Sequence, residues 1–399
     1  MDHPPLKVAY NATPLLSPVT GIGNYIIELG AALAASGAVD PYSFYRYRWR
    51  HEPPSPPVQA PPGGREFINR IKPFIPIRGP IRRTAHYLGF ASGLRRHRID
   101  LYHEPNYVPL SYDVPVVITI HDLSWIGFPQ AHPADRVRWL EQSLPTAIER
   151  AQAILVDSDF IRNEVLTMFG VDTERVRTAH LGVAPRFRPH APEETSAKLE
   201  RFGLAPGRYI LTVGTLEPRK NLRHMLESYA LLPAALRERF PLAIAGARGW
   251  RSSGLVTQIR RVNDRHVRFL GHVDREALPH LYAGAALFAF PSLYEGFGLP
   301  PLEAMASGTP VLVSNRASLP EVVGDAGATM DAYDPVQAAS ILRELLEDPG
   351  RRASMTQRGL SRAARFTWQG CAAITRSVYR DVLAEAHASS EPALENASA

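Results

Sequence analysis

The stretch "FPSLYEGFGLPPLEAMASGTPVLVS" (residues 290–314) indicates the fold class of this 399-residue chain. An apolar segment ends at Phe290, and a loop with two glycines follows it. Two prolines then open a short helical segment before a second apolar segment, residues 310–314. Short segments that are apolar throughout are typical of strands buried on both faces of a parallel sheet. Ligands bind outside the carboxyl ends of such strands, so loop 294–299 is predicted to face a ligand.

The alternation of apolar and helical segments runs through the whole chain, which predicts an α/β fold built from βαβ units. The chain is too long for one ordinary core, so we expect two domains. The rhythm breaks near "GVAPRFRPHAPEE" (182–194), which divides the domains into residues 1–185 and 186–365. The expected strands are 7–11, 99–103, 114–120, 153–157, 209–213, 241–245, 267–270, 286–290 and 310–314, and a helix is expected at 22–36.

Two segments do not fit this rhythm. Residues 51–64, "HEPPSPPVQAPPGG", contain six prolines and two glycines, which predicts a mobile loop inside the first domain. Residues 388–399 are small and polar, which predicts a disordered tail.

The composition, 45% apolar and 21% charged, is that of a globular protein. The sequence has no apolar run long enough to span a membrane, and "MDHPPLKVAY" lacks a signal-peptide pattern. A single cysteine, Cys371, excludes an intrachain disulfide framework and a thiolate metal cluster, so we expect a cytoplasmic protein. The net charge of +6 favours anionic partners, either nucleotides, nucleic acid or an anionic membrane. The arginine-rich composition of a GC-rich genome would also produce this charge.

Two carboxylates, Glu295 and Glu303, flank the glycine loop. Ionised carboxylates accept strong hydrogen bonds from hydroxyl groups, so this pair suits a ligand rich in hydroxyls. Gly296 and Gly298 allow backbone N–H groups to approach such a ligand. The helix that opens at Pro300 and Pro301 points its amino end at the same place and favours an anion. The alternative is that Glu303, in the first helical turn, only caps its helix.

A second element, "VGTLEPRKNL" (213–222), combines a strand end, a glycine turn at Gly214 and two cations. Arg219 and Lys220 stand just before a helix that Asn221 is expected to cap. Two cations at a helix amino end predict a diphosphate site. The alternative is a solvent-exposed basic helix start.

Three motifs in the first half follow predicted strands. "TGIGNY" (20–25) has Gly21 and Gly23, but it is not a dinucleotide fingerprint because an isoleucine stands where the third glycine belongs. The other two, "TIHDLS" (119–124) and "YHEPNY" (102–107), end strands with polar residues, each of which could instead be structural. Those residues are His121 and Asp122 in the first motif, and His103, Glu104 and Asn106 in the second.

The spacing Glu295-(GFGLPPL)-Glu303 resembles the E-x7-E signature of the retaining nucleotide-sugar glycosyltransferases of family 4, which have the GT-B fold. The resemblance implies two Rossmann-like domains that face each other across a cleft, with parallel sheets. The first would bind the acceptor and the second the nucleotide sugar, and a terminal helix, 366–387, would cross back to the first domain. The match covers nearly all of residues 5–385 and is stronger in the second domain.

The resemblance also assigns roles to residues. Glu295 would contact the donor sugar, Glu303 the ribose, and the loop amides the sugar and diphosphate. "RFLGHVDREALPHLYAGA" (268–285) would lie against the nucleobase through His272 and Val273, and "AGARGW" (245–250) would add a wall. The implied catalytic residues are Glu295, Arg219, Lys220 and His121. The implied donor-binding residues are Gly21, Gly23, Gly214, Arg219, Lys220, His272, Val273, Glu295, Gly296, Phe297, Gly298, Leu299 and Glu303. Residues on the acceptor side would be His103, Glu104, Asn106 and Asp122.

Negative charge develops on the departing diphosphate in the expected reaction. Fixed positive charges of the protein would contribute most to stabilising that negative charge. We expect metal-independent catalysis without a cofactor, because "DSD" (157–159) fits a helix cap better than a metal site. The resemblance implies retention through same-face attack, with the leaving phosphate deprotonating the acceptor hydroxyl. We also expect Glu295→Ala to lower turnover without harming the fold, on the interpretation that Glu295 is a surface-loop acid.

"TIHDLS" together with "VGTLEPRKNL" resembles bacterial mannosyltransferases that build polysaccharides from GDP-mannose. GDP-mannose or a GDP-6-deoxyhexose is therefore the first expectation for the donor and a UDP-sugar the second, with a glycan or lipid-linked glycan as acceptor. The alternatives are a GT-B nucleotide-sugar epimerase, a homologue that has lost activity, and a non-enzymatic protein that binds anionic surfaces. No nucleic-acid-binding signature is present, so we expect no nucleic acid partner.

Residues 65–98 mix nine basic residues, including Arg70, Lys72, Arg82 and Arg83, with apolar ones and contain one acid, Glu66. This mixture predicts docking on an anionic membrane, at the inner face of the cytoplasmic membrane. The alternative is that residues 81–98 form a helix of the first domain with a solvent-exposed basic face.

Overall fold

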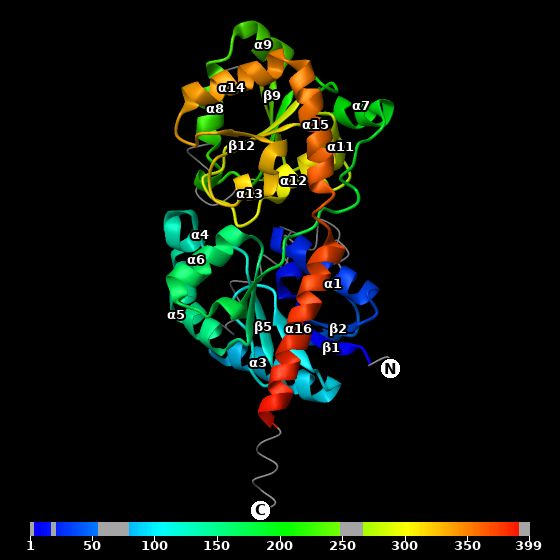
Figure 1. Ribbon diagram of the computed structural model, residues 1–399, viewed down its shortest axis with the longest axis vertical. Helices are drawn as coiled ribbons and strands as arrows, with labels where there is room; N and C mark the ends of the chain where they lie inside the picture. Colours follow the sequence, from blue (N-terminus) through cyan, green and yellow to red (C-terminus); the bar gives the residue numbers. More distant parts are fainter. Residues whose placement is uncertain (1–3, 17–20, 55–79, 248–265, 391–399) are drawn as a thin grey trace, which may run out of the picture.

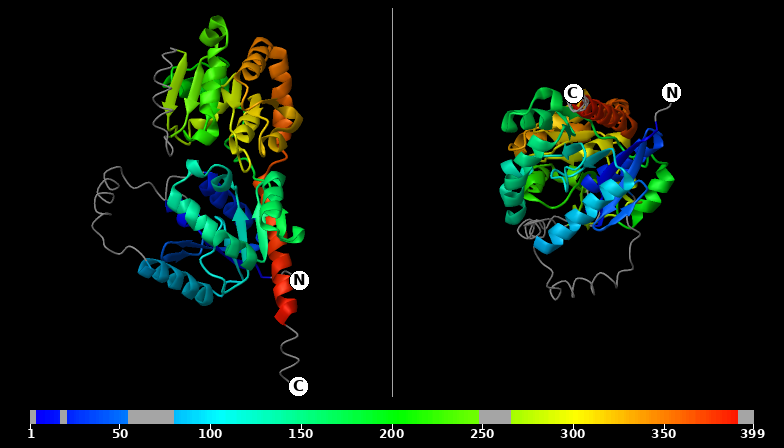
Figure 2. Two further views of the ribbon diagram at one scale, coloured as in Figure 1. Left: turned by 90° about the vertical axis from the view of Figure 1, so that its left-hand side faces the viewer. Right: turned by 90° about the horizontal axis from the view of Figure 1, so that it is seen from below.

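The computed structural model describes residues 4–16, 21–54, 80–247 and 266–390 and consists of two α/β units, one above the other in Figure 1. The predicted loop 51–64 lies outside the described residues from position 55 on, as do residues 65–79 of the basic stretch. Each unit has one twisted sheet with helices on both faces (Figures 1 and 2). This is the predicted fold class.

The first unit contains a seven-stranded sheet in the order β3-β2-β1-β4-β5-β6-β7, parallel except for β3. Its strands are β1 (Leu6–Asn11), β2 (Val39–Tyr45), β3 (Arg48–Arg50), β4 (Leu101–Glu104), β5 (Val116–Ile120), β6 (Ala153–Val156) and β7 (Val176–Thr178). Its helices are α1 (Gly21–Ala35), α3 (Pro80–His97), α4 (Ser124–Gly127), α5 (Ala134–Arg150) and α6 (Asp159–Phe169), with 3₁₀ turns η1 (Thr13–Leu16), η3 (Pro129–Ala131) and η4 (Thr173–Arg175).

The second unit contains a six-stranded parallel sheet in the order β10-β9-β8-β11-β12-β13. Its strands are β8 (Ile210–Val213), β9 (Leu242–Ala245), β10 (Val267–Gly271), β11 (Leu287–Phe290), β12 (Val311–Ser314) and β13 (Ala328–Met330). Its helices are α7 (Pro192–Glu200), α8 (Leu222–Ala230), α9 (Ala234–Arg239), α11 (Leu278–Ala283), α12 (Leu299–Ala306), α13 (Leu319–Val323), α14 (Pro335–Glu347) and α15 (Pro349–Ala363), with 3₁₀ turns η5 (Pro218–Lys220) and η6 (Gly324–Ala326).

The strands are apolar throughout because both of their faces are buried. In β6, Ala153 and Leu155 belong to the core beneath α1, whereas Ile154 and Val156 face the core beneath α5 and α6. Successive side chains of a strand point to opposite faces, so a strand between two helical layers requires apolar residues at every position. The strands omitted from the sequence prediction, β2, β3, β7 and β13, are short or interrupted by polar residues and proline.

Helix α16 (Trp368–Ser390) runs along the first unit and packs against α1 and β6 (Figure 1). It is fixed by a polar contact inside the core, where the Tyr379 hydroxyl lies 2.6 Å from Nδ1 of His103 and 3.2 Å from the Tyr10 hydroxyl. The helix continues to Ser390, so residues 388–390 of the predicted disordered tail are helical, and 391–399 lie outside the described residues.

Candidate active site

A cluster of opposite charges stands at the carboxyl end of β11, in the loop identified from the sequence. Glu295 is only 8% exposed. Its carboxylate accepts hydrogen bonds from Nζ of Lys220 at 2.6 and 2.9 Å and from Oγ of Ser292 at 2.6 Å. Nη1 of Arg219 lies 3.3 Å from the same carboxylate. The two motifs found in sequence therefore meet in one site, which we call the Glu295 cluster.

The charges in the Glu295 cluster support one another. Burial disfavours ionisation of Glu295, but the positive charges of Lys220 and Arg219 outweigh burial and hold the pKa of the carboxyl group below its usual range. Burial lowers the pKa of Lys220, and the charge of Glu295, whose two carboxylate oxygens accept hydrogen bonds from the amine, opposes that shift in part. Glu295 is therefore a buried, paired acid, and the interpretation of it as a surface-loop residue is wrong.

Arg219 and Lys220 lie in η5, between β8 and α8. Asn221 follows with a left-handed backbone, φ 54°, and makes no side-chain cap; its amide donates to the carbonyl of Ala332 at 2.8 Å. The predicted helix cap is therefore wrong. The guanidinium of Arg219 instead donates to the carbonyl of Tyr294 at 2.5 Å, which fixes η5 to the glycine loop.

The backbone structure alone requires glycine at two positions of the loop, without any ligand. A Cβ atom on Gly296 would lie 1.8 Å from the backbone oxygen of His121, in the first unit. Gly298 has φ 118°, a conformation that L side chains rarely adopt. Gly214 is also in tight contact, because a Cβ atom on Gly246 would lie 1.8 Å from its carbonyl oxygen.

Glu303 lies in the second turn of α12, not the first turn as predicted, so it does not cap the helix. Burial raises its pKa to about 7, and the neighbouring Tyr282 hydroxyl and Arg186 charge oppose that rise only in part. The carboxyl group of Glu303 therefore titrates near neutral pH when no ligand is bound.

The glycine loop also holds the two units together. The Tyr294 hydroxyl accepts a hydrogen bond from the backbone of Leu123 at 2.9 Å and donates to Glu164. Oγ of Ser158 donates to the carbonyl of Gly296 at 2.6 Å. Ser158 also caps α6, as the "DSD" motif predicted. The loop that carries Glu295 is thus positioned by both units.

His121 lies beside this loop, but both of its ring nitrogens already have protein partners. Nδ1 is 2.8 Å from the Asp157 carboxylate, and Nε2 is 2.8 Å from the carbonyl oxygen of Pro105. The carbonyl oxygen of Pro105 can only accept, so Nε2 donates to it. Burial would lower the pKa of His121, but the contacts with Asp157 and Pro105 outweigh it and raise the pKa. The predicted contact of His121 with a sugar would require one of these bonds to break.

The residues predicted for the acceptor side lie mostly in the core. His103 is fully buried, its ring nitrogens lie 2.6 Å from Tyr379 and 2.7 Å from Thr119, and burial lowers its pKa to about 3. These contacts give His103 a structural role, because it joins α16 to the sheet, and its contact with an acceptor stays a prediction. Glu104 is buried as well and accepts from the Asn106 backbone at 2.9 Å.

Asp122 accepts hydrogen bonds from the backbone and hydroxyl of Ser124 at 3.0 and 2.7 Å. Burial opposes its ionisation, but Arg219 of the second unit helps to hold the pKa of Asp122 below its usual range. Asp122 therefore belongs to the charge environment of the Glu295 cluster.

The buried Oδ1 of Asn106 has no hydrogen-bond partner among the described residues, which leaves one hydrogen-bond acceptor available after β4.

Four further predicted donor residues show no contact with the Glu295 cluster. Gly21 begins α1 and is exposed, Gly23 is buried in that helix, His272 is exposed after β10, and Val273 is half-buried. Within "AGARGW", residues 248–250 lie outside the described residues. Their donor contacts stay predictions.

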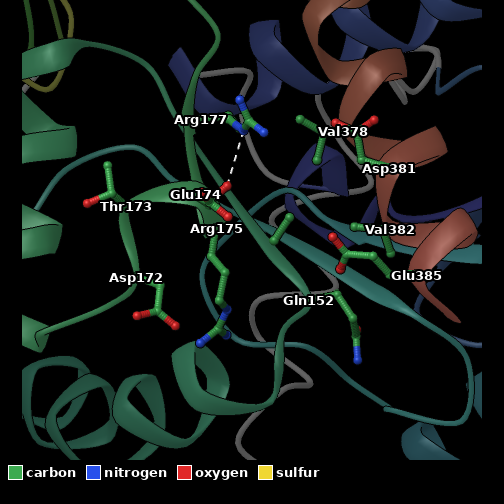
Figure 3. A pocket seen from close by; sticks show the side chains of 11 residues that line it. Gln152, Asp172, Thr173, Glu174, Arg175, Arg177, Val378, Asp381, Val382 and Glu385 are labelled. Carbon is green, nitrogen blue, oxygen red and sulfur yellow. Dashed lines mark hydrogen bonds between the residues drawn. The ribbon is translucent and has the colours of Figure 1, made fainter. Parts of the chain in front are cut away.

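A cavity of about 450 Å³ lies elsewhere, between the η4–β7 segment and α16 (Figure 3). Its walls carry acids and arginines of the first unit, and Arg177 donates to the backbone oxygen of Glu174 at 3.1 Å. It shares no residue with the Glu295 cluster. We place the candidate site at the cluster because that is where buried opposite charges converge at strand ends.

Comparison with known proteins identifies the family of this chain. Residues 19–187 match the family described as Glycosyltransferase Family 4, and residues 198–362 match Glycosyl transferases group 1. The O-antigen chain mannosyltransferase B of Escherichia coli is 37% identical over 381 residues, which cover 94% of this chain and all of that protein. The chain belongs to glycosyltransferase family 4. Its resemblance to that family, inferred from E-x7-E, is confirmed, and it is an enzyme that transfers sugars.

Solved structures show that this glycosyltransferase has the GT-B fold. Sucrose-phosphate synthase from Thermosynechococcus elongatus superposes with a TM-score of 0.73 at 20% identity, covering 95% of this chain and all of that one. WaaG, a glycosyltransferase involved in lipopolysaccharide biosynthesis, superposes with a TM-score of 0.66 at 18% identity, covering 94% and 98%. Among the described residues of the glycosyltransferase, no helix is both long and apolar enough to cross a membrane.

Proposed function

We propose that this glycosyltransferase moves mannose from GDP-mannose, with retention of anomeric configuration, to a glycan or lipid-linked glycan acceptor in polysaccharide biosynthesis. The observation that carries the proposal is the 37% identity along the full length of an O-antigen mannosyltransferase. A second relative, the serotype-specific mannosyltransferase WbdA of Escherichia coli, is 31% identical over 229 residues, 56% of this chain and 28% of WbdA. Both relatives are named for mannose transfer, which supports mannose over glucose.

The Glu295 cluster suits this reaction. Lys220 and Arg219 are cations with largely buried side chains at the carboxyl end of a sheet, where a diphosphate would gain most from them. In the structure, Lys220 and Arg219 both contact the carboxylate of Glu295. Donor binding would replace these contacts with contacts from the two cations to the diphosphate. The freed carboxylate oxygens would then accept hydrogen bonds from sugar hydroxyls.

The chemical step would break the bond between the anomeric carbon and the phosphate oxygen and form one to the acceptor oxygen on the same face. The proton of the acceptor hydroxyl would pass to the departing phosphate. Lys220 and Arg219 would stabilise the negative charge on that phosphate without moving at the moment of reaction. This mechanism assigns no residue as general base and needs neither a cofactor nor an added divalent metal.

The donor is tested with a panel of GDP-mannose, GDP-fucose, UDP-glucose and UDP-galactose in a transfer assay with mannose-terminated oligosaccharides. We expect transfer from GDP-mannose, and NMR of the product should show the α configuration of the donor. A Glu295→Gln variant is the control for contaminating activity. Transfer from a UDP-sugar alone would overturn the proposed donor, and a product of β configuration would overturn retention.

We further propose that the enzyme is cytoplasmic and works at the inner face of the cytoplasmic membrane. In α3, Tyr87 and Leu88 are 42% and 58% exposed, and Arg95 and Arg96 are exposed near its end, while Phe90 and Leu94 pack into the core. The helix lies on the side of the first unit away from α16 (Figure 2). Exposed apolar and basic side chains on one helix suit an anionic lipid surface.

Sedimentation with vesicles of phosphatidylglycerol tests this location, with phosphatidylcholine vesicles as the control. We expect binding to the anionic vesicles at low salt that weakens in a Leu88→Ser variant and in an Arg95→Glu, Arg96→Glu variant. Equal recovery with both lipids, or no binding, would show that α3 only has a solvent-exposed basic face.

A further inference from the structure

Two histidines and a glutamate meet where the connection between the units joins the second unit. His190 lies in the connection, Glu194 in the first turn of α7, and His280 in α11. Each residue offers one ligand atom, and these atoms all lie within 4.8 Å of one another. The imidazole rings are 4.1 Å apart between centroids. We call this group the His190 cluster.

The hydrogen bonding of His190 leaves one of its nitrogens directed at the cluster without a partner. Nε2 lies 3.2 Å from the carbonyl oxygen of Arg186, to which it can only donate. Nδ1 is buried, makes no hydrogen bond among the described residues, and lies 3.7 Å from the Glu194 carboxylate. The neutral form of this ring therefore points a bare nitrogen lone pair at a carboxylate, an arrangement that a cation between them would stabilise. A metal-binding histidine commonly donates its other N–H to a backbone carbonyl in this way.

His280 approaches the other oxygen of the same carboxylate. Its Nε2 lies 3.4 Å from Glu194, and its side chain is 6% exposed, against 8% for His190 and 53% for Glu194. Zinc binds imidazole nitrogen at about 2.0–2.1 Å, so the donor atoms of a tetrahedral site lie about 3.4 Å apart. The distances of 3.7 and 3.4 Å from Glu194 to the two imidazole nitrogens are close to that spacing. The exposed side of Glu194 leaves room for a water as the fourth ligand.

We propose that His190, Glu194 and His280 bind a zinc-class divalent cation that clamps the connection between the units onto α7 and α11. Two imidazoles and one carboxylate form the ligand set that such ions accept, whereas magnesium and calcium prefer oxygen ligands. The clamp is structural and separate from the Glu295 cluster, with which it shares no residue.

The neighbouring connection explains what the clamp would stabilise. Arg186 forms an ion pair at 3.2 Å with Glu28 of α1, in the first unit, and it is also one of the charges that act on Glu303. Tyr282, two residues beyond His280 in α11, is the other neighbour of Glu303. The cation would therefore hold together the two segments that border Glu303.

The surroundings of the His190 cluster also contain cations, namely Arg188 and Lys198, which act on His280. Lys198 has a partner in Glu276 at 3.9 Å, which reduces its repulsion of a bound metal.

A second group of three possible ligands, Asp159, His180 and Glu321, differs in its hydrogen bonding. Glu321 there already accepts from two backbone N–H groups, at 2.9 and 3.0 Å, and lies 2.7 Å from His180. It provides a matched control.

The test uses the full chain, stripped with a chelator, dialysed against micromolar zinc, and assayed for metal content and thermal unfolding. We expect one zinc per chain and a rise in Tm with zinc. Glu194→Gln and His190→Gln should each weaken zinc binding by at least about tenfold, since even outer partners of metal ligands cost that much. Glu321→Gln should keep the zinc. With Co²⁺, the wild type should show the visible absorption of a tetrahedral site, and Glu194→Gln should not.

Glu194→Gln changes an exposed side chain, so it is expected to fold, and circular dichroism checks this. Several outcomes would overturn the proposal: a wild type without zinc, zinc retained in both Glu194→Gln and His190→Gln, or zinc lost only in Glu321→Gln. If Glu194→Gln lowers Tm equally with and without zinc, the cluster is an ion pair between a protonated histidine and a glutamate, which also overturns it.

Discussion

Replacing Glu295 by alanine should damage both the stability and the chemistry of this glycosyltransferase. The side chain is about 10% exposed and pairs with two cations, Lys220 and Arg219, that are themselves 17% and 11% exposed. Removal of the acid leaves two largely buried positive charges without this carboxylate. Breaking a buried ion pair from one side costs about 3–5 kcal/mol. We expect a loss in the lower part of that range, because Glu217, 3.6 Å from Arg219, still compensates part of the charge.

A double-mutant cycle separates the pair from other effects. Glu295→Ala, Lys220→Ala and the double variant are compared by urea unfolding followed by circular dichroism. The double variant should be more stable than the sum of the singles predicts, by about 1–3 kcal/mol, because it removes acid and base together. Glu347→Ala is the matched control, since its pair with Arg343 is exposed and should change stability by less than about 0.5 kcal/mol.

Turnover is measured on the same variants at saturating donor and at a temperature where each is folded. Glu295→Ala should lower kcat by at least about a hundredfold, as loss of one preorganised polar contact in a transition state does. Additive stability losses would refute the buried-pair reasoning. Near-normal turnover in folded Glu295→Ala would refute the assignment of the site itself.

Three further predictions concern pH, domain contact and metal. The pKa of Glu303 is raised to about 7, so its contribution to stability is present below its unfolded value and is lost as pH rises through about 7; Glu303→Gln should remove that decline in urea unfolding. If Glu303 holds ribose hydroxyls as a carboxylate, GDP binding measured by calorimetry should weaken below pH 7 in the wild type and not in Glu303→Gln. Tyr294→Phe removes two hydrogen bonds between the units and should raise KM for the donor by about tenfold, whereas a change in kcat alone would assign the hydroxyl to chemistry. Added Mg²⁺ or Mn²⁺ should leave the initial rate of the chelator-treated enzyme unchanged, and a strict requirement for either ion would refute metal-independent transfer.

The fold could be predicted from the sequence because its buried strands have a distinctive pattern. Segments such as 153–156 are apolar at every position, and only a two-faced parallel sheet requires that. The site could be predicted for a related reason: Glu295, Arg219 and Lys220 each follow a strand, and parallel strands bring their carboxyl ends to one edge of the sheet.

Contacts between distant segments could not be predicted in this way. Nothing local distinguishes His103 from His121, since both follow apolar strands. What decides their roles is a tyrosine 276 positions later for His103 and a carboxylate 36 positions later for His121. Likewise, a loop acid looks exposed in sequence, and only the packing of the first unit against Gly296 shows that Glu295 is buried.

The glycine loop connects donor binding to the contact between the units. Its residues alternate in function along the chain: Tyr294 bonds to the first unit, Glu295 to the cations of the second, and Gly296 again to the first through Ser158. A phosphate that takes Lys220 and Arg219 from Glu295 must therefore shift a segment held on both sides. Differential affinity for two arrangements is the only means by which a ligand shifts an equilibrium. We therefore expect the donor to bind more tightly to one arrangement of the two units than to another. The two arrangements should differ at the backbone of Gly296, where the present contact leaves no space for a Cβ atom.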